Sequence, residues 1–499
     1  MATNLKSLAK DTAIYGVSSI FGRFLNYLLV PLYPQTLSAA SGGYGVITNV
    51  YAWTALILVI LTFGMETTFF RFANKSEENP RTVYSTTLIA VTCVAVAFVV
   101  AVVGFLPLIA PAMGYADHPQ YIAVMAVVVA LDAIQAIPFA YLRYNKQPIK
   151  FAALKLLFIG LNIQLNLLYF VVLPALYKSH PDVIGKIYDP SVGAGYAFYL
   201  NLVCTAFITL FFRKELFGIK YVFDKPLLKR MLRYSWPILV LGIAGILNQT
   251  ADKILFPFIY EAADQKAQLG IYGAAAKIAM IMALITQAFR YAYEPFVFGK
   301  SEDKDNKETY AKAMKYFIIF TLLAFLAVIA WMEFLKYIIA RDYWEGLQVV
   351  PIVMAAEIMM GIYFNLSFWY KLIDKTIWGA IFSGIGCGVL ILVNVLFVPK
   401  YGYIACAWGG FAGYGTAMLL SYFVGQKYYP IAYPLKQIGI YVLLAAALFA
   451  AMVLVPTQGM WLTTLYRTAL LLVFCAFMFR TEHMSKAMKK LPVVGRFFR

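Results

Sequence analysis

The sequence has few charged, cysteine and histidine residues, and each shortage excludes a class of protein. Only 13% of the 499 residues are charged, and 62% are hydrophobic, whereas soluble domains have about 25% charged residues. A water-soluble chain could not bury so much apolar surface, so the composition indicates a membrane protein. The five cysteines lie in apolar runs without a CxxC pair, and the three histidines lie in predicted loops. This pattern argues against a disulfide framework and a metal site.

Several functional motifs are also absent from the sequence. There is no GxxxxGK[ST], no HExxH and no TVGYG stretch, which argues against a built-in ATPase, a zinc protease and a potassium filter. No cleavable signal peptide is evident, because the first apolar run continues as a full-length span. No catalytic constellation is present, so we expect neither an enzyme nor a cofactor.

Apolar runs of about 20 residues, the length that crosses a bilayer, recur along the whole chain. We therefore expect an all-α polytopic membrane protein with about 14 transmembrane helices. The expected spans are 12–32, 43–65, 82–105, 121–142, 152–172, 193–212, 235–256, 269–292, 312–332, 348–370, 379–398, 404–424, 438–456 and 462–480.

The positive charge is distributed unevenly between the two sides of the membrane. Of the 42 Lys and Arg residues, 30 fall in the N-terminus, the even-numbered loops and the C-terminal tail, and 6 fall in the opposite loops. The positive-inside rule places the richer side, and with it both termini, in the cytoplasm. This bias explains the net charge of +18, so no nucleic-acid partner is needed to account for it. We expect part of the positive charge to contact the anionic headgroups of membrane lipids.

The spans divide into six, six and two. We expect an N-terminal six-helix lobe (1–212), a cytoplasmic amphipathic linker (213–234), a C-terminal six-helix lobe (235–424), and helices 13–14 with a basic tail (425–499). The motif Leu28–Tyr33 resembles Ile254–Tyr260, and Gly43–Val46 resembles Leu269–Gly273. These matches predict an internal duplication with a pseudo-two-fold axis along the membrane normal.

Ionisable residues inside spans are costly and are therefore functional suspects. In the first span, Thr12, Tyr15, Ser19, Arg23 and Asn26 share one helical face. This face predicts a cavity lining or a helix contact. The alternative is a structural Arg23 that pairs with a buried acid such as Asp132.

The fifth span repeats this pattern with Lys155, Asn162, Asn166 and Tyr169. One interpretation is that these residues line a cavity. The alternative is that Lys155 snorkels to the interface and that the two Asn residues form hydrogen bonds between helices.

The later spans carry further ionisable residues. Asp252 and Lys253 are sequence neighbours that point about 100° apart, so we expect different partners for them, with an interfacial salt bridge as the alternative. Lys277 and Arg290 lie on the eighth span, where Arg290 can also pair with Glu294.

Two further residues have competing interpretations. Glu357 is a candidate proton or cation site, or else the counter-ion of a cavity cation. Arg467 lies within one turn of a span end, where snorkelling explains it.

Cations on both halves predict a positively charged cavity, which favours anions and especially phosphates. The expected cavity cations are Arg23, Lys277, Arg290, Lys253 and Lys155. The expected polar lining is Tyr15, Ser19, Asn26, Asn162 and Asn166. The candidate ion-coupling residues are Asp132, Asp252 and Glu357.

Three stretches resemble bacterial polysaccharide-biosynthesis flippases of the Wzx type, within the MOP exporter superfamily. These stretches are Asp11–Tyr33 in the first span, Gly43–Gly45 with Gly64–Phe72 in the second, and Tyr234–Pro237 with Asn248–Lys253 in the seventh. The resemblance implies two six-helix lobes in a MATE-like V around a central cavity, with alternating access. It also implies a span-1 arginine at the diphosphate, for which Arg23 is the matching position.

The resemblance implies that the cargo is an undecaprenyl-diphosphate-linked oligosaccharide for O-antigen, capsule or exopolysaccharide. We expect a monomer in the bacterial inner membrane, with a polysaccharide polymerase or glycosyltransferases as further partners. The alternatives are a cation-coupled MATE-like multidrug exporter and a non-transporting scaffold for glycosyltransferases.

Overall fold

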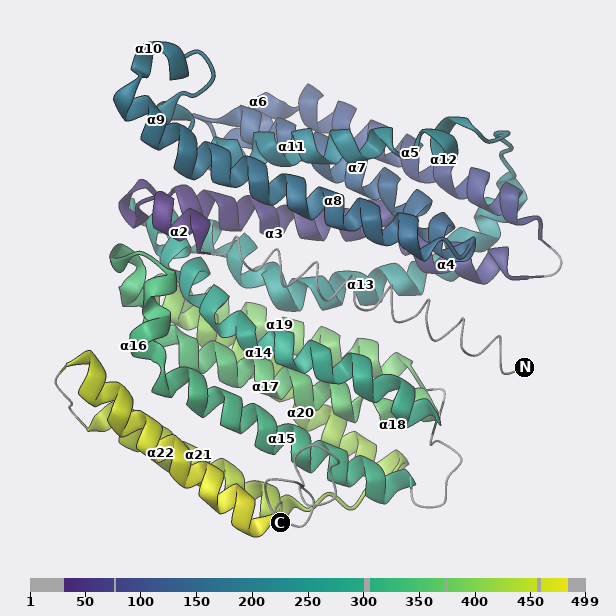
Figure 1. Ribbon diagram of the computed structural model, residues 1–499. Helices are drawn as coiled ribbons and strands as arrows, with labels where there is room; N and C mark the ends of the chain where they lie inside the picture. The colour runs from purple at the N-terminus through teal and green to yellow at the C-terminus, as the bar shows by residue number, and fades with distance from the viewer. Residues whose placement is uncertain (1–30, 76–77, 300–305, 374, 456–458, 483–499) are drawn as a thin grey trace. The chain divides into compact units, whose positions relative to one another are not determined.

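The structure, a computed structural model, describes residues 31–75, 78–299, 306–373, 375–455 and 459–482, and these residues contain helices but no strands (Figure 1). The chain divides into two compact units. Unit 1 comprises the described residues within Met1–Ala274 and Ser383–Gly413, and unit 2 those within Ala275–Phe382 and Tyr414–Arg499. The boundaries fall within α14, α19 and α20, and each unit is described by itself.

Unit 1 contains the first helices of the chain and parts of three later ones. Its elements are α2 (Leu32–Thr36), η1 (Ala39–Ser41), α3 (Gly43–Thr62), α4 (Met65–Ala73), α5 (Pro80–Gly104), α6 (Leu106–Ala112), α7 (Pro119–Tyr144), α8 (Pro148–Leu167), the π-helical η2 (Leu168–Val172), α9 (Leu173–Ser179), α10 (Pro181–Ile184), η3 (Pro190–Val192), α11 (Gly195–Leu210), α12 (Arg213–Phe217), α13 (Lys225–Ile259) and parts of α14 (Gln265–Gly299), α19 (Ile377–Tyr401) and α20 (Tyr403–Tyr428).

Unit 2 contains the remaining parts of α14, α19 and α20 with the helices between and after them. Its other elements are α15 (Asn306–Ala330), α16 (Met332–Leu335), η4 (Lys336–Ile338), η5 (Arg341–Val349), α17 (Val350–Leu366), α18 (Phe368–Leu372), α21 (Leu435–Leu454) and α22 (Met460–Thr481).

The expected all-α polytopic fold is confirmed. Within the described residues, 11 helices are long and apolar enough to cross a membrane. The expected spans 193–212 and 404–424 coincide with the shorter α11 and with α20. The first expected span, 12–32, lies almost wholly outside the described residues.

The expected amphipathic linker has a different form in the structure. Its basic stretch is not a separate surface helix but the first turns of α13, which runs without a break for 35 residues. Asp224 caps this helix by accepting a hydrogen bond from the Leu227 amide (2.9 Å). Leu227 and Met231 are fully buried against α4, α5 and α7, one helical turn apart. The apolar face of this amphipathic stretch is therefore buried within unit 1. The four-part division of the sequence stays a prediction.

The N-terminus of α3 lies against the N-terminus of α14 at an unusually close distance. A Cβ added at Gly45 would lie 1.8 Å from the Lys266 carbonyl oxygen and 3.0 Å from the Gly270 amide nitrogen. Only glycine permits this approach. The two glycine-containing stretches whose sequences resemble each other thus pack directly together, and the internal duplication stays a prediction.

We expect Gly45→Ala to lower the free energy of unfolding by about 1–3 kcal/mol or more, because backbone atoms cannot move aside as a flexible side chain can. Gly160→Ala in α8 is the matched control, since a Cβ there meets nothing within 4 Å. The thermal midpoint of the purified protein should fall for the first variant and stay close to wild type for the second. Equal midpoints would contradict the close approach.

The C-terminal hairpin of α21 and α22 lies beside α15 within unit 2 (Figure 1). An ion pair at each end joins the hairpin to the rest of this unit. At one end the Lys315 ammonium on α15 lies 2.6 Å from the carboxylate of Glu482, and both side chains are largely buried. At the other end the Arg467 guanidinium lies 3.7 Å from Glu333. Arg467 also donates to the Met452 carbonyl (3.1 Å). Arg467 thus has an ion-pair partner in Glu333, and the interpretation that its side chain snorkels stays a prediction.

We expect Lys315→Met to lower the free energy of unfolding by about 3–5 kcal/mol, because the variant leaves the buried charge of Glu482 without its counter-ion. Lys312→Met is the control. It removes an exposed pair with Glu308, whose contribution is about 0.5 kcal/mol or less. Chemical denaturation of the purified variants measures both values, and similar losses would show that the Lys315 pair is not the main anchor.

Candidate functional site: a basic pocket in unit 2

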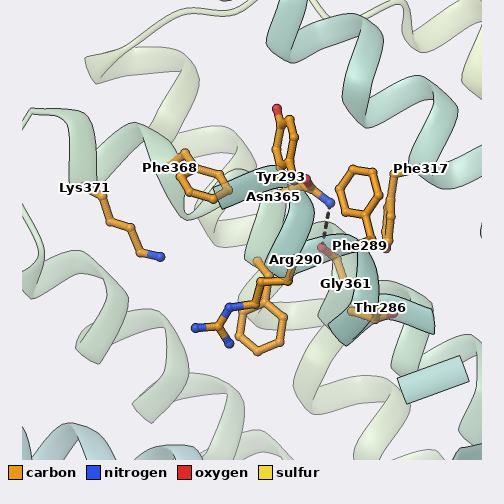
Figure 2. A pocket seen from close by; sticks show the side chains of 10 residues that line it. Thr286, Phe289, Arg290, Tyr293, Phe317, Gly361, Asn365, Phe368 and Lys371 are labelled. Carbon is orange, nitrogen blue, oxygen red and sulfur yellow. Dashed lines mark hydrogen bonds between the residues drawn. The ribbon is translucent and has the colours of Figure 1, made fainter. Parts of the chain in front are cut away.

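A pocket in unit 2 is lined by side chains from four helices (Figure 2). Its empty volume is about 260 Å³, including the open mouth. The lining residues are Thr286, Phe289, Arg290 and Tyr293 from α14, Phe317 from α15, Gly361, Phe364 and Asn365 from α17, and Phe368 and Lys371 from α18.

Helical periodicity places these residues on common faces. The α14 residues follow the i, i+3, i+4, i+7 spacing of one helix face. The residues from Gly361 to Lys371 continue a similar spacing from α17 into α18. A Cβ at Gly361 would lie 2.4 Å from the ring of Phe317. Glycine at this position therefore allows the Phe317 ring to pack directly against the backbone of α17.

Two cations lie at the pocket over aromatic rings. The Arg290 guanidinium carbon is 4.7 Å from the centroid of Phe364, and the Lys371 ammonium is 4.9 Å from that of Phe368. Figure 2 shows both charged groups on the same side of the pocket. Arg290 is exposed and Lys371 is half-buried, and cation–π contacts of this kind help to hold the two charged groups in place. This side of the pocket is therefore suited to an anion.

Two buried polar atoms complete the lining. Thr286 is only 3% exposed, and its hydroxyl has no hydrogen-bond partner within the described part of the chain. The Asn365 amide donates to the Gly361 carbonyl (3.1 Å), but its oxygen Oδ1 is buried without a partner there. Such atoms carry a desolvation cost that a bound group or water can remove.

Unit 1 contains the charged residues expected in the seventh span. The Lys253 ammonium lies 2.9 Å from the Asp252 carboxylate, and the Tyr272 hydroxyl donates to the same carboxylate at 2.6 Å. The two neighbours therefore pair with each other, as the salt-bridge alternative predicts, and the expectation of different partners is wrong. The flexible four-carbon stem of Lys253 bends back across the angle between adjacent helical positions.

A buried hydrogen-bond chain supports α13 at the same place. Pro257 has no amide hydrogen, so the Lys253 carbonyl one turn earlier loses its helical donor. The Asn49 side chain from α3 donates to this carbonyl at 2.7 Å. The Tyr115 hydroxyl donates to Asn49 Oδ1 (2.8 Å) and so orients the amide. Burial raises the pKa of Tyr115, which keeps this hydroxyl protonated as a donor.

The other predicted residues of unit 1 form two local groups. Asp132 on α7 interacts electrostatically with Lys155 on α8, whose ammonium lies 4.0 Å from the Phe139 ring centroid. Asn166 donates to Asn162 Oδ1 (2.9 Å) and accepts from the Tyr33 hydroxyl (2.8 Å). The Asn residues thus hold one another and α2 through hydrogen bonds.

The remaining predicted residues are only partly placed. Lys277 on α14 and Glu357 on α17 belong to unit 2 and are half-buried. Tyr15, Ser19, Arg23 and Asn26 lie outside the described residues. Their roles, and a cavity that would include them, stay predictions.

Of the ten lining residues, only Arg290 is predicted from the sequence. Lys371 follows directly after the expected span 348–370, and Thr286 and Asn365 are not distinctive because a single Thr or Asn in an apolar span is common. The available signal was spacing, since Thr286 lies one turn before Arg290, and Asn365 and Lys371 share a helical face with Phe368.

The fold is similar to that of several solved transporter structures. The chain is similar in structure to the lipid II flippase MurJ in an inward closed conformation (TM-score 0.71, 16% identity, covering 93% of this chain and 98% of that chain). It is also similar to an inward-facing multidrug resistance MATE transporter of the MOP superfamily (TM-score 0.58, 15% identity, 83% and 94% coverage). A MOP superfamily transporter from Pyrococcus furiosus has a TM-score of 0.51 at 14% identity, with 84% and 95% coverage. None of the curated proteins matches the sequence at a significant level.

The protein therefore has the multi-pass helical fold of MOP superfamily transporters. Residues 8–292, more than half of the chain, match the family model described as polysaccharide biosynthesis protein, and the chain belongs to that family. The family resemblance inferred from the sequence is confirmed.

Proposed function

We propose that the protein is a flippase that moves an undecaprenyl-diphosphate-linked oligosaccharide across the bacterial inner membrane for cell-surface polysaccharide biosynthesis. The observation that carries this proposal is the basic pocket of Arg290 and Lys371 inside a transporter fold of the polysaccharide biosynthesis family. A diphosphate needs compensating positive charge to leave water. A neutral or cationic drug does not.

The pocket supplies the first contacts for the diphosphate in this proposal. Arg290 and Lys371 lie at the end of unit 2 that the positive-inside rule assigns to the cytoplasm, the side on which the lipid-linked glycan is built. The sequence adds Arg23, Lys277 and Lys155 as further cations on the route. The charge of Lys253 is compensated by Asp252, so we assign this lysine a smaller part.

The remaining assignments follow from the same function. The oligosaccharide moves by alternating access, and Asp132, Asp252 and Glu357 are the candidates for ion coupling. The protein is a transporter and not an enzyme, acts as a monomer with both termini in the cytoplasm, and delivers its cargo to a polymerase.

A deletion strain tests this function. Loss of the gene should remove surface polysaccharide and cause the lipid-linked oligosaccharide to accumulate on the cytoplasmic leaflet. Complementation with the wild-type gene should reverse both effects. Normal surface polysaccharide in the deletion strain would contradict the proposal.

A second candidate function, multidrug export, is supported by the structural likeness to MATE transporters. It predicts that the deletion strain becomes sensitive to cationic drugs while its surface glycan is unchanged. The cations of the pocket disfavour it, because they would repel such drugs.

A further inference from the structure

We propose that unit 1 contains a hinge at which two helices bend together, and that Ser235 is the latch that holds the hinge in its bent form. The hinge consists of Phe63 and Gly64, which separate α3 from α4, and of Pro237 within α13. This inference rests on the proposed function in one respect, because a transport cycle needs two states of the protein.

The backbone between α3 and α4 has an unfavourable conformation. Phe63 has a φ of 50° and Gly64 a φ of 66°, both in the left-handed region. Glycine adopts this region freely, but an L-residue such as Phe63 is disfavoured there by roughly 5- to 30-fold. Such a conformation persists only where surrounding contacts hold it, and it is frequent in segments that switch between states. The strain at Phe63 therefore favours release of the bend when these contacts are lost.

Ser235 supplies the contact that holds the bend. Its hydroxyl donates to the Phe63 carbonyl at 2.8 Å and lies 2.7 Å from the Thr68 hydroxyl. The Thr68 hydroxyl in turn lies 3.0 Å from the Gly64 carbonyl. Because both hydroxyl side chains are fully buried, water cannot reach them to replace these hydrogen bonds. The bent form therefore depends on Ser235 for the partner of the Phe63 carbonyl.

The helix that carries the latch has a weak point at the same level. Pro237 follows Ser235 by two residues and has no amide hydrogen, so α13 lacks the hydrogen bond to the Arg233 carbonyl. Helices bend preferentially at such positions. A Cβ added at Gly64 would lie 2.8 Å from Cγ2 of Ile238, so the two weak points are packed against each other. A change of angle at one can therefore accompany a change at the other.

The contacts on the two sides of the hinge define two bodies. On one side, α4 and the first turns of α13 share a buried apolar cluster with α5 and α7, and its members include Phe69, Phe72 and Met231. On the other side, the side chain of Asn49 on α3 donates to the Lys253 carbonyl of α13 at 2.7 Å. The hinge lets α3 and the rest of α13 tilt together against the first body.

A disulfide at the latch tests this inference in the full-length protein in lipid vesicles. The variant Thr68→Cys/Ser235→Cys places two sulfur atoms where the hydroxyl oxygens lie 2.7 Å apart, so a small shift allows an S–S bond of about 2.05 Å. We expect oxidation with iodine to form this bond and to lower the flipping rate at least about tenfold. Reductant should restore the rate. Oxidised wild type, which contains the five native cysteines, is the control and should flip normally.

Hydrogen exchange measures the hinge without any cargo. The amides of residues 63–68 should exchange at least about tenfold more slowly in the oxidised than in the reduced variant, because the hinge opens only when the latch is free. Ser235→Ala removes the latch and should speed this exchange about three- to tenfold. Thr250→Ala is the matched control on α13, since the Thr250 hydroxyl bonds within its own helix (2.9 Å), and it should leave the exchange of residues 63–68 unchanged.

The remaining outcomes separate the hinge from the proposed function. Equal exchange in the oxidised and reduced variant would overturn the hinge, and so would full flipping by the disulfide-linked protein. Failure of the disulfide to form would contradict the contact between the two hydroxyls and with it the latch. If the wild-type protein flips no lipid-linked oligosaccharide while the differences in exchange are found, the proposed function is wrong and the hinge stands.

Discussion

Replacing Arg290 and Lys371 together by alanine is expected to lower the flipping rate at least about a hundredfold. A hydrogen bond to a charged group contributes about 1.5–3 kcal/mol, which is roughly 10- to 150-fold for each residue. Both cations line one pocket over aromatic rings, so the double variant leaves the diphosphate without compensation there. The rate is measured with purified protein in vesicles that contain the lipid-linked oligosaccharide.

The controls separate the pocket from the general positive charge of the protein. Lys375→Ala removes an exposed lysine four residues beyond Lys371 that does not line the pocket, and it should leave the rate within about twofold. Arg290→Lys keeps the charge but loses the planar guanidinium, so an intermediate rate is expected. Equal rates for the Lys375 variant and the double variant would exclude a specific role of the pocket.

Asn49→Ala is expected to lower the free energy of unfolding by about 1–3 kcal/mol, the cost of leaving a buried acceptor unsatisfied. The acceptor is the Lys253 carbonyl, which Pro257 deprives of its helical donor and which Asn49 satisfies at 2.7 Å. Asn49 is 2% exposed, so water does not replace the lost amide. Chemical denaturation in detergent measures the change.

Pro257→Ala provides the decisive comparison in a double-mutant cycle. In that background residue 257 has an amide hydrogen that can bond to the Lys253 carbonyl, so Asn49→Ala should be clearly less destabilising than in the wild type. Purely additive effects would contradict the proposed link between the two residues. Tyr115→Phe should give a smaller loss, because it removes only the hydroxyl that orients the Asn49 amide.

Much of the fold could be predicted from the sequence because the bilayer imposes it. Spans of about 20 apolar residues have few alternatives in lipid, and the expected spans from 43–65 onward coincide with helices. The start of α13 could not be predicted in this way. Its basic first turns look like a surface helix, and only the burial of Leu227 and Met231 within unit 1 reveals a continuous helix.

The candidate site was predictable only in part. Arg290 was identified because a cation within a span is costly and rare. Lys371 lies one residue beyond the expected span 348–370, and no rule of composition reveals that α18 continues the face of α17 as far as this lysine. The pairing of Asp252 with Lys253 matches only the alternative interpretation of the sequence, a salt bridge. Helical angles place the two backbone positions apart, but the long lysine side chain decides the contact.

The most direct test of the central claim is flipping by the purified wild-type protein in proteoliposomes. The lipid-linked oligosaccharide is placed in one leaflet, and a membrane-impermeant glycosidase on the opposite side reports its arrival. The account predicts cleavage that is much faster than in protein-free vesicles and that is lost in the Arg290→Ala/Lys371→Ala variant. Cleavage no faster than in protein-free vesicles, with correctly folded protein present, would contradict the account.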